Sequence, residues 1–403
     1  MKVFIFDLLP YRANLDHLKV DGELPRPLGK KYFSPAEQVA TYEEHLAAWE
    51  EMERVGFDGI VMNEHHGTPY GTMNSPNLLA ASIAQRTKRM KICIYGNLLP
   101  IHEPLRLAEE IAMLDCLSNG RLIAGVARGA PREYRIYNIA MAQSRARFDE
   151  CFEVMHKAWT QESFSYEGKF FSYKDVAIWP RPVQQPHPPI WVPVTGSKES
   201  IEWAAKWNVP ITPGSSVQGG EARGDARRDI IRYYAECQAK HGRKVTPDMI
   251  SIQMCCYVAD SKEKALEECG PYFQYLHNTL VGIDQPQFGA LTNPGYSTGG
   301  FRNMARPPQD AKGWRGPIFG GITKEQLAER ADELPWGSPD EVADHIIRQA
   351  EETGAGTALL LCNPGAMPQE MFLNQIKRIG EEVLPRLHAH RMMRVPPAEG
   401  IAR

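Results

Sequence analysis

The chain has 403 residues, of which 43% are apolar and 24% are charged, and its formal net charge at pH 7 is -3. Its length fits one large domain or two to three smaller ones, and its composition is that of an ordinary soluble protein. The small negative charge gives no electrostatic reason to expect nucleic acid or a membrane surface as a partner.

The first residues and the cysteines indicate the cellular setting. An apolar run begins at Val3 and a polar stretch follows at 12–31, so no signal peptide with a cleavage site is expected. No apolar run is long enough to span a bilayer. The eight cysteines include no CxxC pair of the kind that binds zinc or forms a redox couple. We therefore expect a protein of the reducing cytoplasm.

Segments typical of strands and helices alternate along the whole chain. The first strand is expected at 2–9 and the first helix at 35–55, where Ser34 is a good N-cap, Pro35 suits the first helical position and Gly56 ends the helix. Spacings of three and four predict one apolar face formed by Val39, Tyr42, Leu46, Trp49 and Met52. Further strands are expected at 59–63, 90–99, 121–127, 189–195, 209–213, 249–258 and 357–361. Further helices are expected at 75–87, 103–117, 144–159, 197–207, 223–240, 338–352 and 369–387.

Eight short strands, each followed by a helix, favour an α/β fold whose parallel sheet closes into a barrel. An open doubly wound sheet is the alternative, but it would need a glycine-rich turn after the first strand, and Leu8-Leu9-Pro10-Tyr11 is not one. The expectation is a single (β/α)8 TIM barrel over 1–390, with insertions after strand one and around strand seven and a C-terminal tail at 391–403.

Two segments interrupt the alternation. Residues 12–33 delay the first helix, and 277–321 are rich in glycine and proline and carry several aromatic residues. A loop of this length in a compact barrel is usually a lid, an insertion or a disordered segment. The second segment follows strand seven and could fold over the mouth where barrel active sites lie. Its length alone does not decide between a lid and an ordered addition.

Glu64, His65 and His66 end the second strand. Residues in this position face the mouth of a barrel, where a histidine could transfer a proton or donate a hydrogen bond to a charged intermediate. Alternatively, both rings cap the strand and bond to backbone. A metal site is a third interpretation, but adjacent histidines face opposite ways, and His388 and His390, which have the alternate spacing, fall in the closing helix or tail. No metal site is predicted.

Two features suggest an anion site. Arg128 directly follows the fourth strand, where a guanidinium can clamp a phosphate, although a surface ion pair is the simpler interpretation. The turn after strand five contains Gly196, Ser197 and Ser200 at the start of a helix, whose free amides and dipole favour anions. An ordinary serine N-cap is the alternative. Because the arginine and this turn follow neighbouring strands, a shared phosphate pocket is the favoured hypothesis.

The third strand contains Tyr95-Gly96-Asn97. A glycine inside a strand marks a close approach of backbone or ligand. Either Gly96 relieves crowding, or a flat ligand lies against it.

Several stretches, in order, resemble the bacterial luciferase-like monooxygenase family. They are GFDGIVMNEHH, NLLPIHEPLRLAEEIAMLDCLSNGRLIAGVARG, FSYEGKFFSYKDV, PRPVQQPHPPIWVPVTGSKESIEWAA, GSPDEVADHI and EVLPRL. The resemblance covers most of the chain. It implies a β/α barrel that uses O₂ and reduced FMN, usually supplied by a separate flavin reductase, to oxygenate a small organic substrate through a C4a-(hydro)peroxyflavin.

Residue by residue, the resemblance implies that His65 stabilises or protonates that flavin adduct. It implies that Arg128, Gly196, Ser197 and Ser200 bind the FMN phosphate. Tyr95-Gly96 falls where many members have a non-proline cis peptide beside the flavin ring, with Asn97 next to it. Members are commonly homodimers, and the apolar residues of 39–52 and 78–83 could supply an interface or face the barrel.

The chain also departs from the family. Ala127 stands where luciferase has a reactive cysteine, so no thiol chemistry is inferred, and 12–33 and 277–321 have no clear counterpart. Three rival functions remain open. They are a deazaflavin-dependent dehydrogenase on the same barrel, a non-catalytic flavin-binding protein, and a metal-dependent hydrolase using His65 and His66.

Overall fold

A parallel sheet of six strands, in the order β4-β3-β2-β1-β12-β9, lies at the centre of the molecule. The computed structural model describes residues 1–21, 24–25, 27–194, 197–214, 221–281 and 322–391. The strands of the sheet are β1 (Lys2–Asp7), β2 (Gly59–Met62), β3 (Lys91–Leu98), β4 (Leu122–Ala127), β9 (Ser251–Cys255) and β12 (Thr357–Leu361).

Two further strands, β7 (Val192–Val194) and β8 (Ile211–Pro213), pair in parallel and close the sheet into a barrel. On one side, two backbone hydrogen bonds of 2.7 and 2.9 Å run from β4 to the segment 189–191 that leads into β7. On the other side, a parallel bridge joins Ile211 of β8 to Ile250, which precedes β9. Eight strands thus form one ring, and the expected TIM barrel is confirmed.

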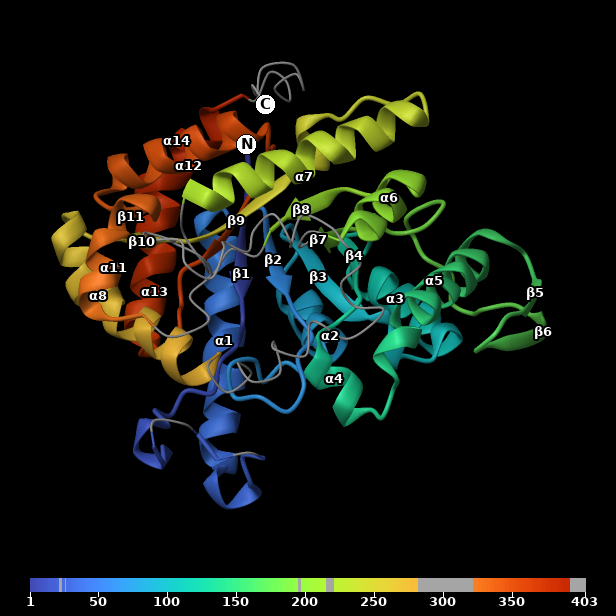
Figure 1. The fold of residues 1–403 in the computed structure, drawn as a ribbon, viewed down its shortest axis with the longest axis horizontal. Helices are drawn as coiled ribbons and strands as arrows, with labels where there is room; N and C mark the ends of the chain where they lie inside the picture. The colour runs from blue at the N-terminus through green and yellow to red at the C-terminus, as the bar shows by residue number, and fades with distance from the viewer. Residues whose placement is uncertain (22–23, 26, 195–196, 215–220, 282–321, 392–403) are drawn as a thin grey trace, which may run out of the picture.

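Helices surround the strands on the outside of the barrel (Figure 1). They are α1 (Pro35–Val55), α2 (Pro76–Arg86), α3 (Pro104–Leu117), α5 (Ser144–Thr160), α6 (Lys198–Lys206), α7 (Glu221–Lys240), α12 (Pro339–Thr353), α13 (Gln369–Arg378) and α14 (Leu384–Ala389). The limits of α1 agree with the sequence because its end signals are local. The Ser34 hydroxyl accepts from the Glu37 amide, and Gly56 ends the helix with φ of 104°. Of its expected apolar face, Val39 is an exception, being 56% exposed.

Two apolar cores flank the sheet. One lies between strands and helices and includes Trp49 and Phe372. The other fills the barrel and includes Phe4, Val61 and Leu359. Successive residues of a strand face opposite sides, so β1, β2, β3, β4 and β12 contribute to both cores. Because both faces of these strands are buried, the strands appear in the sequence as continuous apolar runs.

Smaller elements complete the chain. They are α4 (Pro131–Ile136), the antiparallel pair β5 (Phe164–Glu167) and β6 (Ser172–Val176), the parallel pair β10 (Tyr257–Val258) and β11 (Trp336–Gly337), α8 (Lys262–Tyr275) and α11 (Lys324–Glu329).

Two expected elements are divided in the structure. The prediction of one continuous strand over 249–258 is wrong. The Cys256 amide donates to the Leu361 carbonyl of β12, and after this bond the chain leaves the barrel, so that β10 pairs with β11. The helix expected at 369–387 is interrupted by a π-helical stretch at Ile379–Val383 before α14. Pro385 lacks an amide hydrogen and therefore cannot continue a regular helical bond pattern through this point.

The segment after β1 packs at the carboxyl ends of the strands, in the lower part of Figure 1, opposite the labelled N-terminus. Its Tyr11, Leu15 and Leu24 join the core that fills the barrel, together with Tyr275 at the end of α8. The Leu15 amide donates a 2.9 Å hydrogen bond to the Tyr275 hydroxyl. The described part of the insertion after strand one thus contributes Leu15 and Leu24 to the apolar core at the mouth.

Residues 282–321 lie outside the described residues, so a lid in the segment 277–321 stays a prediction. Among the helices of the described ranges, none has both the length and the apolar character that a membrane crossing requires.

Candidate active site

The residues singled out on strands two, three and four lie at the same end of the barrel. β3 pairs with β2 on one side and with β4 on the other. Asn97 stands opposite Val126 in that pairing, Arg128 follows β4, and His65 follows β2. The fold therefore brings the predicted phosphate residue and the predicted proton-handling residue to the ends of β4 and β2, which flank β3 and its Asn97.

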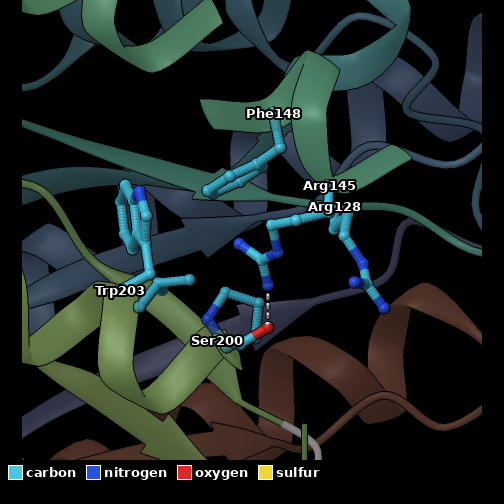
Figure 2. A pocket seen from close by; sticks show the side chains of 7 residues that line it. Arg128, Arg145, Phe148, Ser200 and Trp203 are labelled. Carbon is cyan, nitrogen blue, oxygen red and sulfur yellow. Dashed lines mark hydrogen bonds between the residues drawn. The ribbon is translucent and has the colours of Figure 1, made fainter. Parts of the chain in front are cut away.

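A small pocket, partly open to solvent, lies between the end of β4, α5, β7 and α6. Figure 2 shows Arg128, Arg145 and Ser200 at this pocket, which is lined by Arg128, Arg145, Phe148, Val192, Pro193, Ser200 and Trp203. Nη2 of Arg145 donates a 2.6 Å hydrogen bond to the Ser200 hydroxyl. Two guanidinium groups and a hydroxyl at one pocket form a donor set suited to a phosphate.

Two cations and two carboxylates interact at the pocket. Burial lowers the pKa of Arg145, Asp149 and Glu199 oppose this effect, and the charge of Arg128 adds to it. The Asp149 carboxylate is 3.5 Å from Nη1 of Arg145. Because each cation disfavours the other in a partly dry site, an anion bound between them would relieve the repulsion.

The turn before α6 only partly follows the expectation. Ser200 joins the pocket, whereas the Ser197 hydroxyl donates to the Glu199 carboxylate at 2.7 Å. The Ser197 side chain does not cap the helix, although the residue occupies the N-cap position. Gly196 lies outside the described residues.

Arg145 was missed in the sequence. It stands in the first turn of α5, where the helix dipole disfavours a positive charge. Its position beside Arg128 at the pocket explains why a cation stands there. An arginine in the first turn of a helix is therefore the sequence signal that could have identified Arg145.

The peptide bond between Tyr95 and Gly96 is cis, as the resemblance implies. A Cβ on Gly96 would lie 2.5 Å from the carbonyl carbon of Val126, closer than any side chain tolerates. The glycine therefore relieves crowding between β3 and β4, which is one of the two interpretations left open by the sequence.

Three asparagines at the strand ends carry buried amide atoms without a hydrogen-bond partner among the described residues. Asn97 is 0% exposed, and neither its Nδ2 nor its Oδ1 is paired. Oδ1 of Asn63 and Oδ1 of Asn363 are likewise unpaired. Each such atom costs about 1–3 kcal/mol when it has no partner. Asn63 and Asn363 were missed, although Asn63 directly follows β2 and Asn363 stands two residues after the end of β12.

His65 lies in the loop after β2 and faces α4. Its Nδ1 is 3.5 Å from Oε1 of Glu133, and its ring centroid is 4.7 Å from that of Tyr70. Burial lowers the pKa of His65 despite the neighbouring Glu133 carboxylate. Burial opposes ionisation of Glu133 as well, but His65 and Arg132 together lower its pKa to about 2. At neutral pH the arrangement is a neutral imidazole beside an ionised carboxylate.

Glu64 and His66 form a separate buried network. The Glu64 carboxylate contacts Nε2 of His66 at 2.9 Å and Nε2 of His102 at 2.9 and 3.0 Å, and accepts from the Leu98 amide at 2.8 Å. Burial would raise the pKa of Glu64, but these donors lower it. Burial opposes a charge on His102 also, yet Glu64 raises the pKa of that ring. The network ties the end of β2 to the end of β3.

These contacts bear on the open interpretations of Glu64-His65-His66. The two rings contact two different carboxylates, Glu133 and Glu64, instead of backbone carbonyls. Within the described ranges, no group of three or more histidine, cysteine, aspartate or glutamate side chains is arranged to hold a metal ion.

The short helix α4 was also missed, and it connects both parts of the site. The Tyr134 hydroxyl donates to the Arg128 carbonyl, and the Tyr137 hydroxyl lies 3.1 Å from Nδ1 of His66. Glu133 reaches back to the Ala130 amide at 2.9 Å. A proline at the first helical position followed by a glutamate two residues later was the available signal.

Comparison with known proteins identifies the relatives of this fold and site. The sequence pattern of the family described as luciferase-like monooxygenase matches residues 28–357. The alkanal monooxygenase alpha chain of the Kryptophanaron alfredi symbiont is 25% identical over 308 residues, covering 75% of this chain and 81% of that protein.

Two solved structures share the fold. The oxygenating constituent of 3,6-diketocamphane monooxygenase from Pseudomonas putida, in complex with FMN, superposes with a TM-score of 0.69 at 22% identity, covering 96% of this chain and 98% of that one. An F420-dependent secondary alcohol dehydrogenase superposes with a TM-score of 0.64 at 14% identity, covering 96% and 98%. At these identities the two structures support the fold alone.

Proposed function

The chain belongs to the luciferase-like monooxygenase family, and from this premise we propose that it is an oxidoreductase that uses reduced FMN and O₂ to oxygenate a small organic substrate. The observation that carries the proposal is the pocket of Arg128, Arg145 and Ser200 at the end of β4. A phosphate there would accept hydrogen bonds from both guanidinium groups and would neutralise their mutual repulsion.

The remaining site residues fit the rest of FMN. The isoalloxazine ring has a polar edge with hydrogen-bond donors and acceptors, and Asn97 offers an unpaired donor and an unpaired acceptor. Asn97 lies on the strand between Arg128 and His65. A ring reaching from the phosphate pocket across β3 would therefore approach the imidazole of the second strand.

Each residue has a defined task in this proposal. Arg128, Arg145 and Ser200 bind the phosphate, with Ser197 and the backbone of Gly196 beside it. Tyr95-Gly96 and Asn97 support the ring, and Glu64 and His66 hold the end of β2 in place. His65 forms a hydrogen bond or holds a proton at the reaction centre, while the apolar wall of Tyr11, Leu15 and Tyr275 excludes water. When bound, reduced FMN supplies the electrons that activate O₂.

The proposal extends to partners and organisation. We expect one barrel domain over 1–390 with a tail at 391–403, in a cytoplasmic protein that receives reduced FMN from a separate reductase. The diketocamphane enzyme is itself described as an oxygenating constituent. A homodimer is also expected from the resemblance to the family, and the exposed Val39 and Leu78 are candidates for its interface. Light scattering on the purified protein measures the oligomeric state.

The decisive experiment compares FMN with riboflavin, which lacks the phosphate. We expect Arg128→Ala to weaken FMN binding far more than riboflavin binding, measured by flavin fluorescence. Equal losses for the two ligands would remove the phosphate assignment. Reduced FMN with a panel of ketones, aldehydes and aromatic substrates should then give oxygenated product and O₂ uptake. Flavin binding without O₂ uptake across the panel would favour a non-catalytic flavin-binding protein.

A deazaflavin-dependent dehydrogenase is the second candidate, because an F420-dependent enzyme has the same fold. It would transfer hydride to or from its substrate without O₂. Absorbance titration with both cofactors separates the two: tight F420 binding with no affinity for FMN would favour the dehydrogenase.

A further inference from the structure

The imidazole of His65 is confined by its neighbours. A Cβ on Gly71 would lie 3.3 Å from the ring, so this glycine leaves just enough room for it. The Tyr70 ring covers it with a centroid distance of 4.7 Å, and Glu133 lies 3.5 Å from Nδ1. Nδ1 itself is buried and makes no hydrogen bond among the described residues, so Glu133 acts on it through its charge, while 25% of the side chain stays exposed. The buried edge of the ring therefore faces the carboxylate, and the accessible part faces away from it.

Glu133 is itself held in place. Its carboxylate accepts from the Ala130 amide and from Nη2 of Arg132, each at 2.9 Å. Nε of Arg132 donates to the His66 carbonyl at 2.6 Å, and its guanidinium lies over the Tyr70 ring at 5.4 Å. The start of α4 and the loop after β2 are thus fastened together, which fixes the position of the carboxylate relative to the imidazole.

We propose that Glu133 is a positioning residue that holds His65 in the tautomer with its proton on Nδ1 and its lone pair on Nε2. An ionised carboxylate can only accept, so it favours an N–H on the ring nitrogen nearest to it. A lone pair on Nδ1 would instead face a full negative charge at 3.5 Å. His65 then presents a proton acceptor to the mouth of the barrel.

The charges around His65 support this assignment. Glu133 and Arg132 face it from α4, Tyr70 from its own loop, and Glu64 adjoins it in the chain. Burial raises the pKa of Tyr70 to about 12, so its hydroxyl stays neutral. Burial lowers the pKa of His65 and keeps the ring neutral near pH 7, which makes the choice of tautomer chemically important. What the acceptor does in catalysis rests on the proposed function, whereas the tautomer does not.

A purely structural role for Glu133 is the competing explanation, because its bond to the Ala130 amide already stabilises the start of α4. That role predicts a loss of stability in a Glu133 variant without any change in His65. The two explanations therefore differ in a property of the imidazole that can be measured without flavin.

The test is nitrogen-15 NMR of the full flavin-free chain with labelled histidine, with the His65 signals assigned from His65→Gln. We expect the Nδ1-protonated tautomer in the parent. Glu133→Gln should populate the other tautomer and lower the pKa of His65, and Glu133→Asp should restore the parent behaviour in part. Asp115→Asn is the matched control, since Asp115 is also fully buried and accepts from Gln184 at 2.8 and 2.6 Å.

An Nε2-protonated parent, or a Glu133→Gln protein with unchanged tautomer and pKa, would overturn the proposal. If Glu133→Gln does not fold, the His65 tautomer in the parent and in Glu133→Asp tests the proposal. With reduced FMN, we further expect Glu133→Gln to lose about tenfold in product yield with unchanged FMN affinity. An NMR result as expected in a protein that binds no flavin would remove the proposed function and leave the tautomer assignment standing.

Discussion

The two ends of the candidate site differ in how their charged side chains are paired. At the end of β4, Arg128 and Arg145 meet at one pocket with a serine, and the carboxylate of Asp149 is 3.5 Å from the nearer guanidinium. At the end of β2, the carboxylates of Glu64 and Glu133 are each surrounded by donors from the protein itself. The first end brings two cations together at a partly open pocket, whereas the second is a closed network of carboxylates and their donors.

The contrast indicates which end depends on a ligand. Two cations that repel each other at one pocket are stabilised when an anion binds between them, so these residues should affect binding. A closed carboxylate–histidine network is organised before any ligand binds, so its residues should affect stability and the chemistry of His65. The following variants test that division, beginning with the largest expected effect.

His65→Ala should separate chemistry from binding. Loss of a proton-handling group lowers product formation by about 10²–10⁴-fold, while FMN affinity stays unchanged because the phosphate pocket is intact. Hydrogen peroxide should replace the product, measured as the ratio of the two per reduced FMN consumed. His388→Ala, an exposed histidine that contacts Asp58 at 3.0 Å, is the control. Full coupling in His65→Ala would refute the role of this residue.

Glu64→Gln should affect stability most. The substitution leaves two histidines and a backbone amide around a neutral group, so we expect a loss of about 3 kcal/mol in the free energy of unfolding, measured with urea. Glu267→Gln breaks an exposed pair with Lys264 and should cost less than about 1 kcal/mol. Similar losses in both variants would show that the network around Glu64 does not organise the strand ends.

Arg145→Ala should weaken binding without unfolding the protein. Removing one charged donor from a phosphate is expected to raise the FMN dissociation constant about 10–100-fold and to leave riboflavin unaffected. Arg147→Ala is the matched control on the same helix, because Arg147 contacts Gln143 and Phe170 instead of the pocket. A loss of FMN affinity in Arg147→Ala as large as in Arg145→Ala would contradict the proposed pocket.

His102→Gln should change the pH dependence of stability by the smallest amount, about 1 kcal/mol. Glu64 raises the folded-state pKa of His102 above 6.5, so this contribution is complete below about pH 6.5 and is lost as the pH rises through the raised pKa. The parent should therefore lose more stability than the variant between about pH 6 and about pH 9 in urea unfolding. Parallel curves for the two proteins would mean that His102 carries no folding-linked proton.

The sequence predicts the limits of helices and strands where the signals are local. The ends of α1 follow from Ser34, Pro35 and Gly56, and the limits of β12 agree with the expected 357–361. The division of the expected strand at 249–258 could not be predicted, because it results from pairing of Tyr257 with Trp336, about eighty residues away. The side chains of Ser197 and Ser200 look equivalent in the sequence, but only Ser200 joins the pocket.

Local patterns were enough to predict the alternation of strands and helices and the placement of His65 and Arg128 at the ends of strands, and stretches along most of the chain carry the family resemblance. The contacts of Arg145 with Arg128, of Glu133 with His65, and of Glu64 with His66 and His102 are visible in the folded chain alone. Such contacts join side chains from different elements, and their distances are set by how the helices pack around the barrel, which no local pattern encodes.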